Sequence, residues 1–191
     1  MSTEQQSLST EDSLRIITSM IHQAQGNLSR NSFYFLLWGT VVVMGNLGMY
    51  VLMVYTDYPY PHVAWLITVP AWLVSFYYGY RQSKVASVTT HLDRINTWAW
   101  ISYGISIFIV ILFGYKINYN INAVVMIMTA IPTLIAGVIL KFKPLLAGSV
   151  CFWISGIGCF LASVETQFLI GALGVLGGYV IPGIILRYKA G

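Results

Sequence analysis

Ionisable side chains are missing from most of this chain. Six apolar stretches contain no Asp, Glu, His, Lys or Arg, and each is 18 to 23 residues long. At a rise of about 1.5 Å per residue, such a stretch crosses a hydrocarbon layer of about 30 Å as a helix, which satisfies its own backbone hydrogen bonds there. The sequence therefore predicts six membrane-spanning helices, over residues 33–55, 63–80, 98–115, 121–140, 145–164 and 167–186.

Polar sequence is correspondingly scarce. The six stretches occupy 119 of the 191 residues, and the longest polar segment is residues 1–32. A segment of that length is too short to bury a hydrophobic core of its own. We therefore expect no water-soluble domain of ordinary size, and any function must be exerted in or beside the membrane.

The residue types that intramembrane enzymes and proton-coupled transporters use for catalysis or proton transfer are also absent from the six stretches. Such proteins place carboxylates, histidines, a nucleophile with its base, or a metal cluster inside the bundle. The two cysteines, Cys151 and Cys159, both fall in the fifth stretch, eight residues apart along one helix, so they cannot pair with each other. We therefore expect no enzymatic activity, no bound metal and no cofactor.

The few charges are strongly asymmetric. Of the basic residues, only Lys116 lies on one side of the predicted membrane, beside Asp57 and Glu165. Nine basic residues lie on the other side in short segments, which predicts that this side, with both termini, is cytoplasmic. The net charge of +4 then reflects topology and attraction to anionic headgroups, not nucleic-acid binding. The nine residues are Arg15, Arg30, Arg81, Lys84, Arg94, Lys141, Lys143, Arg187 and Lys189.

Two polar segments carry helical patterns. Residues 1–9 are rich in Ser, Thr, Glu and Gln and are expected to be disordered. Residues 10–32 place apolar residues on one face of a predicted cytoplasmic amphipathic helix. A second stripe, Val85, Val88, Leu92 and Ile95, predicts another such helix. The two helices would either cover each other's apolar faces or each lie flat among the lipid headgroups. The apolar stripe of the first helix comprises Leu14, Ile17, Ile21 and Leu28.

Together these features predict the fold class, an all-α polytopic membrane bundle. Its membrane domain would span residues 33–187 as six helices in three hairpins, followed by a cytoplasmic tail at 188–191. Short amphipathic helices would lie on the inner face.

Small residues concentrate on the last two stretches. On the sixth, Gly171, Gly174 and Gly178 share one helix face, and Gly174 and Gly178 form a GxxxG step. Small faces let helix backbones approach closely, which is the main attraction available in lipid. The glycine face predicts either packing within one chain or an interface with a second copy.

Prolines and isolated polar residues allow a different hypothesis. Pro70, Pro132 and Pro182 interrupt the second, fourth and sixth stretches, and kinked helices can create a binding point near the midplane. The candidate polar lining would be Asn46, Thr68, Tyr103 and Thr129, although hydrogen bonds between helices explain these residues equally well.

Three fragments carry a resemblance. They are residues 33–39 (FYFLLWG), residues 141–145 (KFKPL) and residues 181–183 (IPG). Together they resemble a group of uncharacterised small bacterial inner-membrane proteins with six helices and a short cytoplasmic start. The resemblance implies a bacterial cytoplasmic membrane. It implies no activity, and it assigns no functional residues.

The leading hypothesis is a non-enzymatic membrane component with an interaction or regulatory role. Its partners would be the lipid bilayer and either a second copy or another membrane protein, contacted through the Leu14 to Leu28 stripe and the glycine face. The alternative is a passive channel or facilitator for a small neutral solute. An enzyme acting on lipid would require His22, His91 and Asp93 to converge at one interface.

Overall fold

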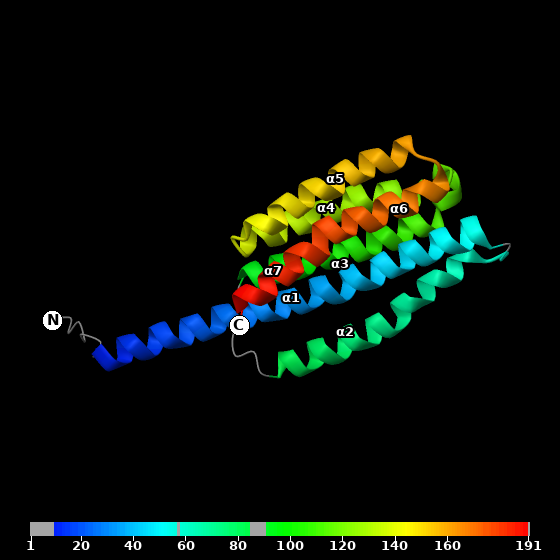
Figure 1. The fold of residues 1–191 in the computed structure, drawn as a ribbon. Helices are drawn as coiled ribbons and strands as arrows, with labels where there is room; N and C mark the ends of the chain where they lie inside the picture. The colour runs from blue at the N-terminus through cyan, green and yellow to red at the C-terminus, as the bar shows by residue number, and fades with distance from the viewer. Residues whose placement is uncertain (1–9, 57, 85–90, 191) are drawn as a thin grey trace.

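All regular secondary structure in the part of the chain that the structure describes is helical. The computed structural model describes the backbone of residues 10–56, 58–84 and 91–190, and the side chains of these ranges except residues 10–31, 83 and 190. The elements are α1 (Thr10–Tyr55), η1 (Pro61–Ile67), α2 (Thr68–Ser83), α3 (His91–Leu112), η2 (Gly114–Ile117), α4 (Ile121–Ile139), α5 (Lys143–Leu161), α6 (Val164–Val175), η3 (Leu176–Val180) and α7 (Ile181–Ala190). Figure 1 shows them running back and forth along one axis.

Six helical segments are long and apolar enough to cross a membrane, as predicted. Their limits agree with the predicted stretches to within three residues, except at the start of the third, which begins at His91 instead of Trp98. Asp93 lies in the first turn of α3, where a carboxylate is favourable to the helix dipole, so the polar residues before Trp98 continue the helix. The six segments are Ser32–Tyr55, Pro61–Gln82, His91–Leu112, Ile121–Ile139, Lys143–Leu161 and Val164–Lys189.

The first membrane span and the segment before it are one uninterrupted helix. α1 contains 46 residues and is therefore about 69 Å long. Figure 1 shows its first half projecting beyond the end of the bundle. The predicted amphipathic helix at 10–32 is thus continuous with the first span. The side chains of its stripe, and residues 1–9, lie outside the described part of the chain, so its amphipathic character stays a prediction.

The second predicted amphipathic helix is also untested over most of its length. Val85 and Val88 fall in residues 85–90, outside the described ranges. Leu92 and Ile95 form part of the first turns of α3, where both side chains are exposed.

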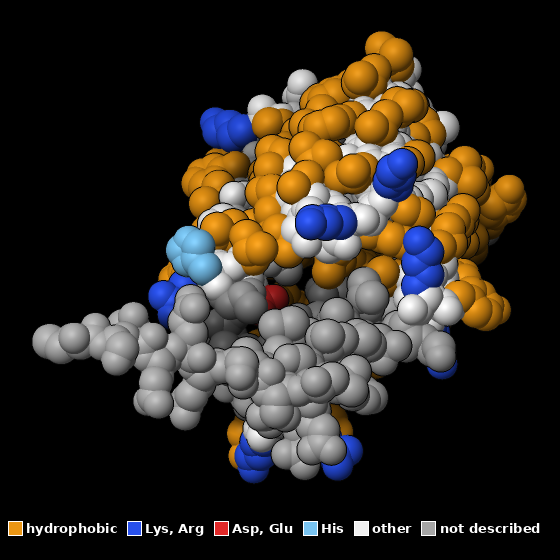
Figure 2. All heavy atoms as spheres, turned by 90° about the vertical axis from the view of Figure 1, so that its left-hand side faces the viewer, with side chains coloured by type: hydrophobic (Ala, Val, Ile, Leu, Met, Phe, Trp, Pro, Cys, Tyr) orange, Lys and Arg blue, Asp and Glu red, His pale blue; other side chains and the backbone are white. Residues whose placement is uncertain are grey.

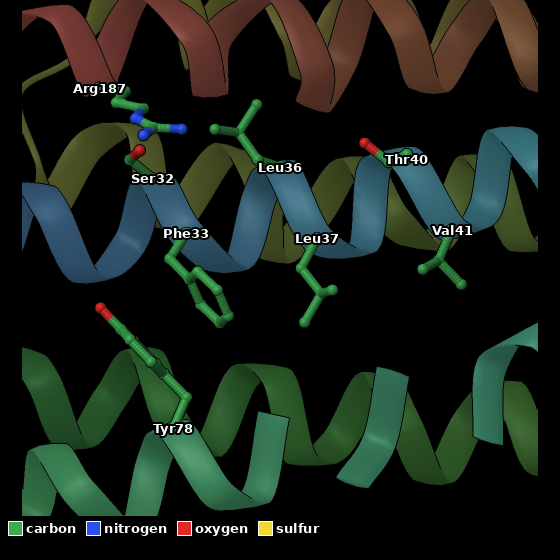
Figure 3. Close-up of a pocket in the computed structure, with 8 residues that line it drawn as sticks. All are labelled: Ser32, Phe33, Leu36, Leu37, Thr40, Val41, Tyr78 and Arg187. Carbon is green, nitrogen blue, oxygen red and sulfur yellow. The ribbon is translucent and has the colours of Figure 1, made fainter. Parts of the chain in front are cut away.

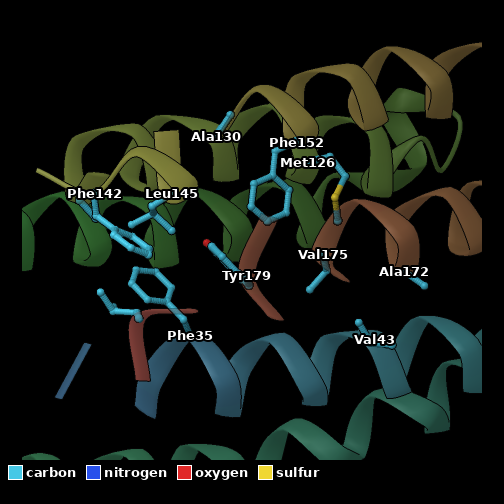
Figure 4. Close-up of a cluster of buried hydrophobic side chains, with 12 residues drawn as sticks. Phe35, Val43, Met126, Ala130, Phe142, Leu145, Phe152, Ala172, Val175 and Tyr179 are labelled. Atoms are coloured by element: carbon cyan, nitrogen blue, oxygen red, sulfur yellow. The ribbon is translucent and has the colours of Figure 1, made fainter. Parts of the chain in front are cut away.

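The core of the bundle lies between α1, α4, α5 and the α6 to α7 segment. Figure 4 shows Phe35 and Val43 of α1 facing Tyr179, Val175 and the aromatic ring of Phe152. α5 approaches α4 and α6 through glycines. A methyl group built on Gly156 would lie 2.5 Å from a side-chain carbon of Ile127 on α4, and one on Gly148 would lie 2.6 Å from the carbonyl oxygen of Gly178. Such approaches are possible only without a side chain.

The sixth span changes its helical form before Pro182. η3 is a single wide π turn, in which the amide of Ile181 donates to the carbonyl oxygen of Leu176. Pro182 has no amide hydrogen to return to Gly178, which is a common reason for such irregular turns. Pro132 is accommodated inside the continuous helix α4, and Pro70 lies in the first turn of α2. The three prolines therefore occupy three different helical settings.

The grouping into three hairpins stays a prediction. α4 packs more extensively on α5 than on α3, although the prediction paired it with α3. α1 packs along α6 and α7 as well as on η1 and α2. Each consecutive pair of spans is antiparallel, so the boundaries between hairpins are not distinguished by the packing of the described residues.

Basic side chains gather at one end of the bundle. Figure 2 looks onto that end and shows Lys and Arg distributed around it. The turns and helix ends that meet there carry Arg81, Lys84, Arg94, Lys141, Lys143, Arg187 and Lys189, all of them exposed. Lys116 lies on η2, in the connection between α3 and α4 at the opposite end. The basic residues that the sequence assigns to one side of the membrane therefore lie together at one end of the folded molecule.

Candidate functional site

Buried polar side chains meet at two levels of the core. The first is an amide cluster made by Asn46 of α1, Asn120 and Asn122 at the start of α4, and Gln167 of α6. The Asn122 side-chain amide donates to Asn46 Oδ1 at 3.0 Å and to the Gln167 carbonyl oxygen at 2.7 Å. Gln167 Nε2 donates to Asn120 Oδ1 at 2.7 Å. This cluster joins three spans that are far apart in the sequence.

Backbone carbonyls at both ends of the amide cluster set the direction of its hydrogen bonds. Asn46 Nδ2 donates to the carbonyl of Val42 at 2.9 Å, so Asn46 Oδ1 is left to accept from Asn122. Asn120 Nδ2 donates to the carbonyl of Ile117 at 3.1 Å, so its Oδ1 accepts from Gln167. Gln167 is 1% exposed, and its Oε1 has no partner among the described residues.

Gly171 makes room for the amide cluster. A methyl group at this position would lie 2.5 Å from Asn122 Nδ2 and 3.0 Å from Asn46 Oδ1. Cβ atoms in proteins essentially never lie closer than 3.0 Å to another heavy atom. Any residue with a side chain at this position would therefore displace the amides. The first glycine of the predicted face therefore serves the hydrogen bonds between α1 and α4.

The second level is a hydroxyl cluster made by Tyr103 of α3, Thr129 and Thr133 of α4, and Tyr179 of η3. The Tyr103 hydroxyl bonds to the hydroxyl of Thr129. Thr133 Oγ1 donates to the Thr129 carbonyl at 2.7 Å and lies 3.2 Å from the Tyr179 hydroxyl. Aromatic rings surround Tyr179, with ring centroids of Phe152, Phe35 and Trp100 at 4.7, 5.5 and 6.2 Å.

An apolar layer separates the two clusters. Asn122 and Thr129 are about 10 Å apart along α4. Met126 lies between them on the same buried face, and Val43 and Val175 belong to the same hydrophobic cluster. Figure 4 shows these three side chains directed into the interior. Within the described residues, the polar groups therefore form two closed centres instead of one continuous lining.

The predicted polar lining is divided between these centres. Asn46 belongs to the amide cluster, and Tyr103 and Thr129 belong to the hydroxyl cluster. Thr68 joins neither, since its hydroxyl donates to the carbonyl of Trp65 on its own helical segment at 2.7 Å. Asn122 and Gln167 were missed as lining residues. An amide inside or at the first position of an apolar run is the signal that could have identified them.

The predicted interaction residues are found in different surroundings. Gly174 lies against Ser155, and Gly178 lies against Phe152, in addition to Gly171 against the amides. All three positions are buried and are already occupied by packing within one chain. These contacts support the intrachain alternative for the glycine face. The side chains of Leu14, Ile17, Ile21 and Leu28 lie outside the described residues.

The remaining candidates for chemistry do not converge where the structure describes them. No group of three His, Cys, Asp or Glu side chains in the described part of the chain could hold a metal ion. His91 and Asp93 lie on the first turn of α3, and His22 belongs to the undescribed side chains. Cys159 is buried and its thiol donates to the Gln167 carbonyl at 3.5 Å, whereas Cys151 lies beside Gly177.

Comparison with known proteins adds no family assignment. The chain has no match among protein-family models, and it has no significant match to a curated protein or to a solved structure. The class therefore follows from the fold itself. Six apolar helices of spanning length, arranged as a bundle with its basic residues at one end, are compatible with a multi-pass membrane protein.

Proposed function

We propose that this protein is a non-enzymatic component of a bacterial inner membrane, with both termini in the cytoplasm, that acts by binding another protein chain. The observation that carries the proposal is the length of α1. Residues 10–31 extend the first span by about 33 Å beyond the basic end of the bundle. A helix that continues out of the membrane without interruption can present its apolar stripe to a protein partner.

The arrangement of the interior supports a role in binding over a role in catalysis or conduction. Both polar centres are used for hydrogen bonds between the protein's own helices, and an apolar layer closes the space between them. The hydroxyl and amide groups are not accompanied by a described base, acid or metal ligand set. The interior thus stabilises the fold, which leaves the surface of the projecting helix as the proposed functional region.

The test replaces apolar residues of the stripe by a charged residue. The double variant Ile17→Asp/Ile21→Asp should prevent partner binding while the protein still inserts into the membrane. The matched control is Ser19→Asp/Gln23→Asp, which adds the same charge to the opposite face of the same helix. Copies with two different tags would reveal self-association on co-purification, and quantitative mass spectrometry would reveal another partner. Equal recovery with both double variants would contradict the proposal.

The orientation can be tested separately in intact cells. In a Cys151→Ala/Cys159→Ala background, Tyr58→Cys should react with a membrane-impermeant maleimide from outside, and Lys84→Cys should react only after permeabilisation. Both residues are exposed and lie outside the apolar spans or at their edge. The reverse labelling pattern would place the projecting helix outside the cell and would overturn the proposal of a cytoplasmic partner.

A passive facilitator is the competing function. It would require a solute to pass the layer formed by Val43, Met126 and Val175. Purified protein in liposomes should therefore give no more flux of small neutral solutes than empty liposomes. Flux that is lost on replacing Met126 by Trp would favour the facilitator and reject the proposed binding role.

A further inference from the structure

A pocket opens on the surface of the bundle at its basic end. It has a volume of about 530 Å³ and lies over α1, between α2 and α7. Figure 3 shows Arg187, Ser32 and Tyr78 at one end of the pocket and Val41 at the other. Phe33 of α1 stacks on Tyr78 of α2 with ring centroids 3.9 Å apart, which holds the two helices together beside the pocket.

The lining of this pocket changes from cationic to apolar along the membrane normal. Arg187 is exposed at the basic end of the pocket. From Ser32 to Val41 the wall follows α1 for about 14 Å. The apolar residues of this wall are Phe33, Leu36, Leu37 and Val41, with Thr40 as a small polar residue among them. The pocket therefore combines one positive charge at the interface with an apolar path toward the bilayer centre.

The surroundings favour a negatively charged occupant. Arg187 and Lys189 of α7 lie at the same end of the molecule as Arg81 and Lys84 of α2, so the entrance lies in a region of positive potential. A guanidinium group binds phosphate oxygens in a planar, bidentate geometry. A free inorganic anion would not contact the apolar wall, and an uncharged hydrocarbon would not pair with the charge of Arg187.

We propose that this pocket binds one anionic phospholipid of the basic leaflet. Its phosphate contacts Arg187 at the interface, and one acyl chain lies along Leu37 and Val41. This site goes beyond the proposed binding of a protein partner, and it does not use residues 10–31. The lipid would contact α1, α2 and α7 together.

The charge of Arg187 is tested by lipid competition. The full-length protein, purified in mild detergent, is incubated with equimolar phosphatidylglycerol and phosphatidylcholine of the same acyl chains, and retained lipid is measured by native mass spectrometry. The wild-type protein should retain phosphatidylglycerol preferentially, and Arg187→Gln should weaken that retention roughly fivefold. Arg81→Gln, which removes an arginine at the same end but outside the lining, should weaken it clearly less than Arg187→Gln does. Equal retention of the two lipids, or equal effects of the two variants, would overturn the proposal.

The acyl chain is tested by filling the apolar part of the pocket. Thr40→Phe should reduce phosphatidylglycerol retention, whereas Thr97→Phe on the exposed surface of α3 should not. An excess of inorganic phosphate or of deacylated glycerophosphoglycerol should not displace the bound lipid. Displacement by either, or full retention in Thr40→Phe, would show that the pocket recognises an anion alone and would refute the lipid site. Neither result depends on the protein-partner experiment.

Discussion

The six spans differ greatly in how they contribute to the fold, although their sequences are similarly apolar. In the most hydrophobic window of each span, half of the residues of the fourth and sixth spans are buried, and a third of those of the first and fifth. The corresponding share is 6% in the second span and 0% in the third. α2 and α3 are therefore peripheral, and the other four spans form the core.

Small residues and amides account for this difference. Lipid and leucine are equally apolar, so hydrophobicity alone does not bring two helices together in a membrane. The core spans carry glycines that contact a neighbouring helix and amides that bond across helices. On α3, a side chain added at Gly104 would meet nothing within 4 Å. A run of apolar residues thus specifies a span, whereas small and polar residues specify its neighbours.

The largest expected effect comes from placing a large side chain at Gly148. Gly148→Leu would collide with the backbone of Gly178, which cannot move as a flexible side chain would. We expect a loss of about 3 kcal/mol or more in the free energy of unfolding. Gly104→Leu on α3 is the matched change and should alter stability by less than about 0.5 kcal/mol. Unfolding in detergent micelles measures both, and similar losses would show that the two regions are packed alike.

A smaller loss is expected from breaking the amide cluster. Asn122→Leu would leave Asn46 Oδ1 without its donor and would remove the stronger of two side-chain donors to the Gln167 carbonyl, at a cost of about 2 kcal/mol. Asn96→Leu provides the comparison on α3, because the buried Asn96 Oδ1 has no partner among the described residues. That variant should retain or slightly gain stability. If Asn96→Leu were the more destabilising of the two, the assignment of the core would be wrong.

The hydroxyl cluster connects α3 to the core and should contribute less. Tyr103→Phe removes the bond to Thr129, but the Thr129 hydroxyl still donates to the carbonyl of Val125. A loss of about 0.6 kcal/mol is expected, the average for such bonds in membranes. Ser106→Ala, whose hydroxyl bonds within α3 itself, is the control. If Tyr103→Phe lowered the free energy of unfolding several times more than this, α3 would depend on the hydroxyl contact as strongly as the core spans depend on their contacts.

The smallest effect has the opposite sign. Gly104→Ala should stabilise the protein by about 0.5 kcal/mol, because alanine favours a helix and the site is open. Gly171→Ala makes the same change where the methyl group would displace Asn122, and it should destabilise. Thermal unfolding of the two variants in the same detergent compares them directly. Stabilisation by both would mean that the amide cluster tolerates displacement.

Much of the architecture was predictable because it depends on local composition. The limits of the spans agree with the apolar stretches to within three residues, except at the start of the third span. The basic residues meet at one end because consecutive spans alternate in direction. The start of α3 was predicted too late, since His91, Asp93 and Arg94 are polar and yet helical. The continuity of α1 through Ser32 was not predicted, because Gly26 lowers helix propensity without breaking a helix.

The candidate sites depended on contacts that no local pattern contains. Gly171, Gly174 and Gly178 share a face in any helix, but whether that face meets the protein's own helices or a second copy depends on how α6 is rotated. Asn46 and Asn122 are 76 residues apart, and their pairing follows from the packing of both α1 and α4 on α6. The pocket at Arg187 likewise requires α1, α2 and α7 to meet.

The sequence by itself determined that this chain contains six helices of spanning length, and which ends of them carry positive charge. Both properties follow from the free-energy cost of placing charges and unpaired backbone groups in hydrocarbon. This cost applies to each stretch separately, whatever the other stretches do. The tertiary structure decided which spans form the core, where the amides pair and where a pocket opens beside Arg187. These features depend on how each helix is rotated and how closely it approaches its neighbours. In a membrane, the shape of the packing surfaces and the hydrogen bonds between helices determine this arrangement, because lipid is as apolar as the side chains.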